Sequence, residues 1–434
     1  PGVQFDAKLK EAVEAGTVSE QTIDDKVRRI LYVAARLGAF DHRFDGQAGA
    51  VDTPAHRAVA REAANECLTL LKNDDAVLPL DPDGIRSLAV IGPNADAIRA
   101  GGGGSSLVDP LYFVTPLAGI RELAGERIRV DYCRGCSLPW SLDAVPSTAL
   151  FTAADRKEPG LRGEYFANRD LAGEPALTRV DTFVDFNWNG SPGAPLGSEN
   201  YSVRWTGVLV APEDGDIDLG TYSDDGSRLY VNGQLLVDNW GDHGPQGRTA
   251  RLSMKKGEAV EIRMEYYQAA GGANARLGWC AGEKEMAQAA AVAARCDAVV
   301  LCVGLAPEFE GEDRDRVDMN LPGNQVKLIE AVVAANPRTI IVFIGGSPIV
   351  MDPWLKTVPA MLCAWYPGQE CGHAVADALF GRINPSGKMP ITFPKRLEDN
   401  PSYENYPGSG GTENYAEGLL VGYRYYDTRN VEPQ

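Results

Sequence analysis

DAVVLCVGLAPEFEGEDRDR, residues 297–316, is a largely apolar segment that runs directly into a loop crowded with carboxylates. Its first part, residues 297–303, has the length and β-branched content of a buried strand. Similar apolar runs occur at 88–91 and 339–344, and a helical pattern covers residues 325–335. Alternation of buried strands with helices predicts an α/β fold whose mainly parallel sheet is covered on both faces.

The chain between these α/β segments has a different texture. Residues 158–281 hold short alternating stretches, such as YSVRW at 201–205 and RLYVN at 228–232, punctuated by Gly, Asp and Asn. This pattern is typical of an all-β sandwich. Because α/β segments lie on both sides of it, we expect the sandwich to be inserted into a loop of the α/β domain.

Both ends of the chain lack strand patterns. Apolar residues at helical spacing stop at Gly16, and TVSE at 17–20 has the spacing of a capping box for a second helix that closes near Gly38. The apolar stripes of these two helices need a partner outside residues 1–45. Residues 400–417, rich in Pro, Gly, Ser, Asn and Tyr, predict an extended linker or surface loop.

Composition excludes several classes of protein. The 434 residues are 44% hydrophobic and 24% charged, as in soluble globular proteins. Acidic residues outnumber basic ones, 60 to 42, for a formal net charge of −18, so nucleic acid is not expected as a partner. No apolar run reaches about 18 residues, so neither a membrane span nor a membrane partner is predicted. These features leave open a homo-oligomeric state and the compartment, whether cytoplasmic, periplasmic or secreted.

The cysteines and histidines predict no metal site. Most of the eight cysteines lie in apolar stretches, where free core thiols are expected. CRGC at 133–136 has redox-motif spacing, but it lies where a strand leaves into a loop rather than where a strand enters a helix. The four histidines are far apart in the sequence, so a zinc site is not expected, and no cofactor is implied.

The loop that follows residues 297–303 carries the candidate chemistry, because open α/β sheets bind ligands at the carboxyl ends of their strands. Glycoside cleavage needs one carboxyl group that protonates the leaving oxygen and a second that attacks the sugar carbon. Glu310 suits the first role, since Gly311 lets backbone and substrate approach closely. Glu308 is the second candidate, and Arg314 is a candidate for orienting acids and contacting substrate. A solvated acidic loop or a calcium site would show the same charge pattern.

An ordered set of motifs resembles glycoside hydrolase family 3. EGEDR at 310–314, followed by Leu-Pro at 321–322, is similar to that family's acid/base loop. Pro-Gly at 1–2 with IDDKVRRIL at 23–31 resembles the end of its (β/α)8 barrel and the exit helix. Further similarities follow in family order: IGPNAD at 91–96, GGSS at 103–106, WYPGQE at 365–370, NPSGKMP at 384–390 and GYRY at 422–425.

The inserted segment resembles the β-domain first known from anthrax protective antigen. Three stretches carry this resemblance: GEYF at 163–166, WTG at 205–207 and YSDDGSRLYVNG at 222–233. Related lectin domains hold calcium, so Asp224 and Asp225 fit either a calcium site or a hairpin turn before a glycine.

In some family 3 enzymes such a domain overhangs the sugar pocket. The resemblance implies that Trp240, Asp242 and His243 line the outer, aglycone side of the site. A tryptophan ring stacks well on a sugar ring, but Trp240 fits equally well as a loop anchor in the sandwich core.

The resemblance implies a division of the chain into five segments. These are the last barrel helices and exit linker at 1–45, the first half of an α/β sandwich domain at 46–157, the inserted protective antigen-type β-sandwich at 158–281, the second half of the α/β domain at 282–395, and a linker towards a fibronectin type III-like domain at 396–434.

The family's nucleophile is an aspartate in a Ser-Asp-Trp-type motif on the barrel, and no such motif occurs here. The resemblance therefore implies a fragment that carries the acid/base residue and needs the missing barrel portion as its partner. The implied reaction hydrolyses terminal non-reducing β-D-glucosyl residues of β-linked oligosaccharides or aryl glucosides, with retention and without a cofactor. The alternatives are a β-xylosidase or α-arabinosidase of the same family, and a non-catalytic carbohydrate-binding module.

Overall fold

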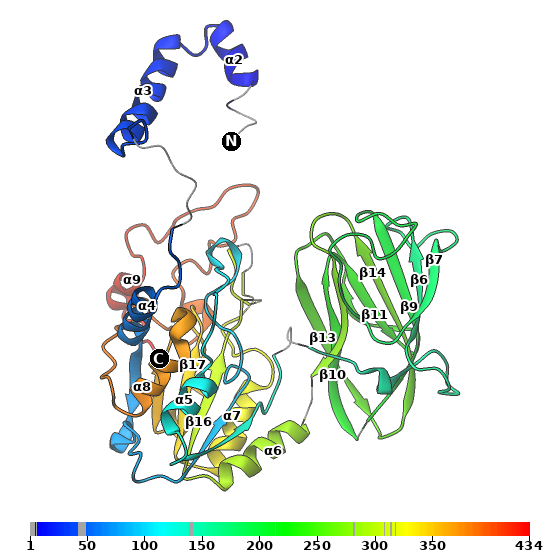
Figure 1. The fold of residues 1–434 in the computed structure, drawn as a ribbon, viewed down its shortest axis with the longest axis vertical. Helices are drawn as coiled ribbons and strands as arrows, with labels where there is room; N and C mark the ends of the chain where they lie inside the picture. The colour runs from blue at the N-terminus through cyan, green and yellow to red at the C-terminus, as the bar shows by residue number, and fades with distance from the viewer. Residues whose placement is uncertain are drawn as a thin grey trace. The chain divides into compact units, whose positions relative to one another are not determined.

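The computed structural model describes residues 5, 7–41, 49–138, 142–212, 214–280, 283–307, 309–312, 315–316 and 318–434. It forms two compact units, Pro1–His56 and Arg57–Gln434 (Figure 1).

The first unit contains the helices α2 (Ala7–Glu14) and α3 (Glu20–Arg36), and no residue of either helix is buried. The predicted capping box at 17–20 is wrong. Ser19 is the N-cap of α3, because its hydroxyl oxygen accepts a hydrogen bond from the Thr22 backbone N–H at 3.1 Å. Thr17 instead donates its hydroxyl to the Ala12 carbonyl at the end of α2. The apolar stripe of α3 is open to solvent, with Ile30 69% exposed.

The second unit is built on a six-stranded sheet in the order β1-β18-β17-β16-β2-β3. Its strands are β1 (Thr69–Asn73), β2 (Ser87–Ile91), β3 (Arg129–Cys133), β16 (Ala298–Gly304), β17 (Thr339–Ile344) and β18 (Ala360–Cys363). All neighbours pair in parallel except β1 and β18, which are antiparallel. Every residue of β2, β16, β17 and β18 is buried, which explains their continuous apolar runs.

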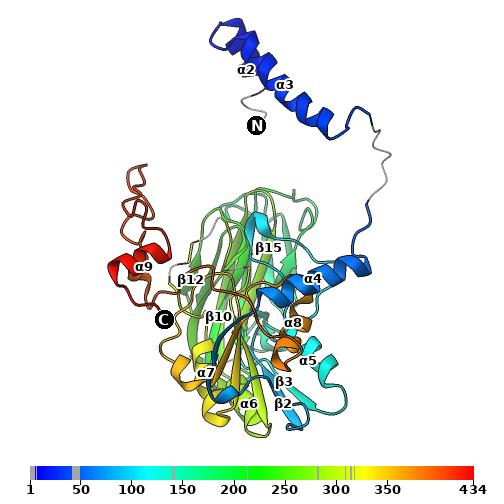
Figure 2. The same cartoon turned by 90° about the vertical axis from the view of Figure 1, so that its left-hand side faces the viewer.

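Helices cover both faces of this sheet (Figure 2). One face packs on α4 (Pro54–Cys67), α5 (Pro116–Ala124) and α8 (Cys371–Leu379). The other packs on α6 (Glu283–Ala294) and α7 (Gln325–Ala335). The predicted mainly parallel α/β fold is confirmed. Of the eight cysteines, all are free thiols and seven are buried, as expected for core positions.

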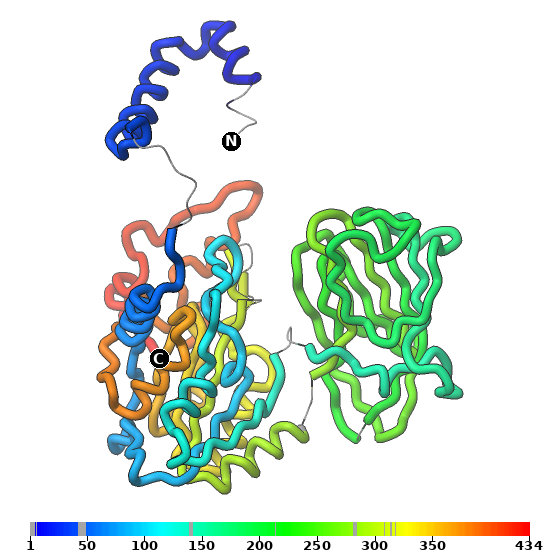
Figure 3. Tube along the Cα trace, viewed as in Figure 1, coloured from blue at the N-terminus to red at the C-terminus, as the bar shows by residue number. Residues whose placement is uncertain are grey.

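Two antiparallel sheets form the sandwich inserted between β3 and α6 (Figure 3). One has the order β13-β10-β15-β4 with β8 beside β15, and the other has the order β12-β11-β14-β9-β6-β7 with β5 beside β9. The strands are β4 (Asp143–Ala144), β5 (Leu150–Phe151), β6 (Leu161–Phe166), β7 (Leu177–Asp181), β8 (Asp185–Asn187), β9 (Tyr201–Val210), β10 (Gly215–Asp224), β11 (Ser227–Val231), β12 (Gln234–Asn239), β13 (Gln246–Met254), β14 (Ala259–Gln268) and β15 (Asn274–Cys280). Because β4 and β5 belong to these sheets, strand pairing begins before residue 158.

The C-terminal segment, residues 396–434, packs onto the α/β domain. It contains the short helix α9 (Tyr423–Arg429), which the sequence pattern does not predict. The Gln434 side chain donates to the Ile349 and Pro394 carbonyls at 2.8 and 2.6 Å and accepts from the Asp352 N–H at 3.2 Å. Across the described residues, no helix has both the length and the apolar character needed to cross a bilayer.

Candidate active site

The end of β16 is held in place by a buried glutamine of α7. The Gln325 side chain accepts from the Gly304 N–H at 2.8 Å and donates to the carbonyls of Gly304 and Pro322 at 2.9 and 3.0 Å. On the other side of β16, the buried Asn94 amide donates to the Leu305 carbonyl at 3.1 Å. These contacts fix the point from which the carboxylate-rich loop departs. Asn94 belongs to the IGPNAD motif, whereas Gln325 does not stand out in the sequence, because a buried amide has no periodic signature.

Replacing Gln325 by leucine is therefore expected to destabilise the chain by at least about 2 kcal/mol, since three main-chain groups lose their partners in a buried place. Urea unfolding of the chain measures the loss. Glu330→Ala, an exposed change on the same helix, serves as the control. Equal midpoints for the two variants would contradict this account of the strand end.

The Glu310 carboxyl group is held by groups from two neighbouring strand ends. Gly346, which follows β17, directs its N–H at Oε2 and Oε1 from 2.9 and 3.2 Å. Tyr366, which follows β18, donates its hydroxyl to Oε2. The side chain is half-buried. The carboxyl ends of three adjacent parallel strands therefore meet at this carboxyl group, the edge where open α/β sheets bind ligands.

The glycine-rich loop at 101–106, which follows β2, forms hydrogen bonds with the loop that carries Glu310. The Gly103 N–H donates to the Glu310 carbonyl at 2.5 Å, and the Ser105 N–H donates to Glu312 Oε2 at 3.3 Å. A Cβ atom at Gly103 would lie 2.5 Å from the Pro307 carbonyl oxygen, so a larger residue would push the loop away. The GGSS motif thus positions the carboxylate loop through main-chain contact.

Two further side chains tie down the part of the loop beyond Glu310. Arg316 donates to Ser347 Oγ, the Pro348 carbonyl and the Asn320 carbonyl at 2.9, 2.8 and 3.0 Å. Burial lowers the pKa of this guanidinium from its ordinary value, and the nearby Glu310 opposes the shift. Tyr406 of the C-terminal segment donates to Asp315 Oδ2 at 2.8 Å. The other two candidates of this loop, Glu308 and Arg314, lie outside the described residues.

Two of the three sandwich candidates, Trp240 and Asp242, contact Tyr267. The Trp240 ring is tilted against the Tyr267 ring, with 4.7 Å between the two centroids. The Arg228 guanidinium lies over the Trp240 ring, 4.5 Å from the centroid of that ring. Asp242 accepts the Tyr267 hydroxyl at 2.7 Å and pairs with Arg169, and these contacts, led by the Tyr267 hydrogen bond, lower its pKa.

The third candidate, His243, is occupied by main-chain groups. Its ring nitrogens lie 2.8 and 3.0 Å from the Gly244 and Asn239 carbonyls.

Trp240 lines a hollow of about 490 Å³ with Tyr267, Asn168, Arg169, Asp170, Asn200 and Ala167. Among the described residues, no hydrogen bond or ion pair joins Trp240, Asp242 or His243 to Glu310.

Asp224 and Asp225 lie at the junction of β10 and β11, which belong to different sheets and do not pair, so the predicted hairpin turn is wrong. Asp225 accepts from the His243 N–H at 3.1 Å and from the Ala269 N–H at 2.7 Å, so both carboxylate oxygens fasten neighbouring loops. Within the described ranges, no group of three or more His, Cys, Asp or Glu side chains is placed to hold a metal ion.

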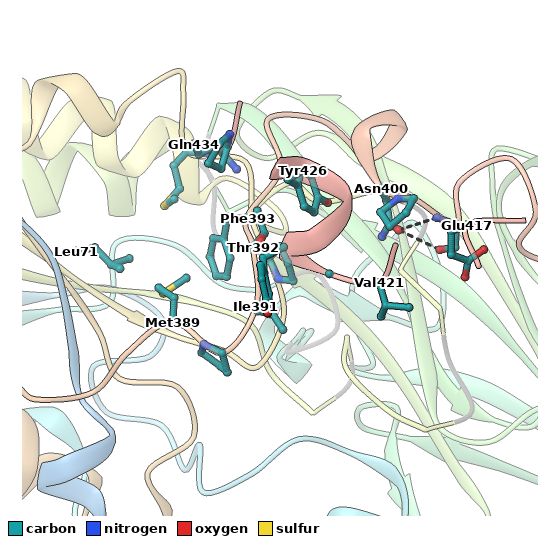
Figure 4. Close-up of a pocket in the computed structure, with 18 of the residues that line it drawn as sticks. Leu71, Met389, Ile391, Thr392, Phe393, Asn400, Glu417, Val421, Tyr426 and Gln434 are labelled. Atoms are coloured by element: carbon teal, nitrogen blue, oxygen red, sulfur yellow. Dashed lines mark hydrogen bonds between the residues drawn. The ribbon is translucent and has the colours of Figure 1, made fainter. Parts of the chain in front are cut away.

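The large cavity of the α/β domain is a separate feature (Figure 4). Its volume is about 810 Å³, and its lining is mostly apolar, including Met351, Met361, Met389, Phe393 and Tyr426. Neither Glu310 nor Tyr366 lines it. It lies between the C-terminal segment and the sheet and is not part of the candidate active site at Glu310.

Known proteins resemble the chain over nearly its whole length. A β-glucosidase of Rhizobium radiobacter is 36% identical over 447 residues, covering 98% of this chain and 53% of that protein. β-Glucosidase B of Emericella nidulans is 31% identical and covers 96% of this chain. The crystal structure of a β-glucosidase from Kluyveromyces marxianus in complex with glucose is 30% identical, with a TM-score of 0.66 over 98% of this chain.

The chain spans about half the length of the curated relatives it matches, 53% of the Rhizobium protein. The model of the glycosyl hydrolase family 3 C-terminal domain matches residues 68–423, which include the sheet, the inserted sandwich and the Glu310 loop. The chain therefore belongs to glycosyl hydrolase family 3.

Proposed function

We propose that this chain supplies the acid/base half of a retaining β-glucosidase active site, with Glu310 as the general acid/base. The observation that carries this proposal is the Glu310 carboxyl group, half-buried and held by Tyr366 and Gly346 at the convergence of three strand ends. Relatives that are about 30–36% identical over nearly the whole chain are named β-glucosidases, which supports the reaction class.

In the first step Glu310 gives its proton to the departing glycosidic oxygen while a carboxylate attacks the anomeric carbon. In the second step Glu310 takes a proton from water as that water displaces the enzyme from the sugar. The attacking aspartate would come from the (β/α)8 barrel of the family, and the described part of this chain forms no such barrel. The 434 residues alone are therefore expected to be inactive, and the reaction needs no cofactor.

The substrate contacts proposed for this chain come from two places. Trp240, Asp242 and His243 of the sandwich would line the aglycone side, with Trp240 offering a ring face for stacking. Arg314 is the substrate contact proposed in the acid/base loop, and Glu308 is the second candidate for the acid. The substrate would be a β-linked oligosaccharide or an aryl glucoside.

Expression from the complete reading frame tests the proposal. Upstream sequence should encode a barrel with a Ser-Asp-Trp-like strand end, and the purified protein should release glucose from cellobiose and from aryl β-glucosides. Faster release from aryl β-xylosides or aryl α-arabinosides would favour the β-xylosidase or α-arabinosidase alternative. A reading frame without a barrel would favour the carbohydrate-binding module.

A further inference from the structure

The two oxygens of the Glu310 carboxyl group have unequal surroundings. Oε2 accepts the Tyr366 hydroxyl and also the Gly346 N–H at 2.9 Å. Among the residues that the structure describes, Oε1 accepts only the longer branch of the Gly346 N–H, at 3.2 Å. A carboxylate oxygen has two lone pairs for hydrogen bonds, so two donors fill Oε2. A proton bound by Glu310 therefore has its free place on Oε1.

Tyr366 is fixed tightly enough to impose this arrangement. Its neighbour Trp365 donates its ring N–H to Thr69 Oγ1 at 3.2 Å and accepts the Gly345 N–H on its carbonyl at 3.2 Å. The Tyr366 ring packs on the α/β core and lies close over Gly346, where an added Cβ would approach the ring to 3.2 Å. The phenol and the Gly346 N–H thus reach Glu310 from a single rigid corner between β17 and β18.

We infer that Tyr366 is a positioning residue for acid/base catalysis: together with the Gly346 N–H it occupies Oε2 of Glu310, so that Oε1 carries the transferable proton. This inference rests on the proposed function. In the first step the proton on Oε1 passes to the glycosidic oxygen as its bond to the sugar breaks. In the second step Oε1 takes the proton from the attacking water. Tyr366 itself gains and loses no proton.

The test is Tyr366→Phe in the protein expressed from its complete reading frame, because phenylalanine keeps the ring packing and removes only the hydroxyl. We expect kcat for cellobiose to fall by about tenfold to about a hundredfold, the ratio that the loss of one hydrogen bond to a charged group produces. We expect the rate constant for glycosyl-enzyme formation from 2,4-dinitrophenyl glucoside, measured in the pre-steady-state burst, to change by less than about threefold, because its leaving group departs without a proton. KM for cellobiose should change little.

Tyr230→Phe is the matched control. Its ring contacts the Arg263 guanidinium, and its hydroxyl forms no hydrogen bond within the described residues. This variant should leave both rates unchanged. A merely structural role of Tyr366 would lower the rates on both substrates alike, and that result would overturn the inference, as would an unchanged rate on cellobiose.

Glu310→Ala, assayed in parallel, separates the two proposals. If it abolishes cellobiose hydrolysis while Tyr366→Phe has no effect, only the positioning role fails. If Glu310→Ala hydrolyses cellobiose normally, both the proposed function and the positioning role of Tyr366 fail. The thermal midpoint of each variant checks that the fold is intact. Gly346→Ala, whose added Cβ would crowd the Tyr366 ring, should reproduce the leaving-group dependence of Tyr366→Phe.

Discussion

Glu310→Ala in the protein expressed from its complete reading frame is expected to lower kcat/KM for cellobiose by about a hundredfold to about ten-thousandfold. This is the contribution that a positioned general acid makes when the leaving group is poor. Dinitrophenyl glucoside should still form the glycosyl-enzyme quickly, because its leaving group needs no proton. Steady-state rates with each substrate and the pre-steady-state burst with the activated one measure the two steps.

Azide provides the control for this prediction. A small anion that fits the space left by the missing side chain attacks the glycosyl-enzyme without base assistance, so azide should partly restore turnover of the activated substrate. The product should be β-glucosyl azide, identified by NMR. Full activity of the variant on cellobiose would refute the assignment of Glu310, whatever azide does.

Asp181→Ala is expected to destabilise the inserted sandwich by at least about 2 kcal/mol, because two buried donors, the Tyr165 hydroxyl and the Trp205 ring N–H, lose their acceptor. Asp181 is 7% exposed. Its carboxylate accepts the Tyr165 hydroxyl, the Trp205 ring N–H and the Arg179 guanidinium at 2.6, 2.7 and 2.7 Å. Without Asp181, three donors from β6, β7 and β9 lose their shared acceptor, and the Arg179 charge is left without its buried partner.

Urea unfolding followed by tryptophan fluorescence measures this loss, because Trp205 lies in the sandwich core. The matched control is Asp185→Ala. Asp185 pairs with Arg276 at 2.7 Å, and both side chains are about a third exposed. Its loss should cost less than about 1 kcal/mol, as for other solvent-screened pairs. Equal effects of the two substitutions would show that the Asp181 cluster does not stabilise the sandwich.

The sequence predicts those helices and strands whose apolar residues form a regular pattern within one segment of the chain. The continuous apolar runs at β2, β16 and β17 and the helical spacing at α7 are local patterns, so their elements are confirmed. The helix α9 is not predicted, because its seven residues follow a stretch of Gly and Tyr without periodicity. The capping box at 17–20 is wrong because α3 begins at Glu20, and Ser19, directly before it, is the N-cap in place of Thr17.

The sequence predicts the role of Glu310, and its GGSS and WYPGQE motifs include Gly103 and Tyr366 without giving either residue a role. Glu310 lies in a loop whose charge and position after a strand are visible in the sequence. Tyr366 and Gly346 are 56 and 36 residues away along the chain, and only the parallel pairing of three strands brings them to its carboxyl group. The same holds for Gln325, whose burial at the end of β16 depends on the packing of α7. Contacts of this kind depend on tertiary structure, which local patterns do not encode.

The most direct test is the separation between two carboxyl groups. A crystal structure of the protein expressed from its complete reading frame, with glucose bound, gives the distance from the Glu310 carboxyl group to the nucleophilic carboxylate of the barrel. A retaining mechanism predicts about 5–5.5 Å, with Glu310 Oε1 facing the sugar. A separation of about 6.5 Å or more, or a Glu310 side chain directed away from the sugar, would contradict the account.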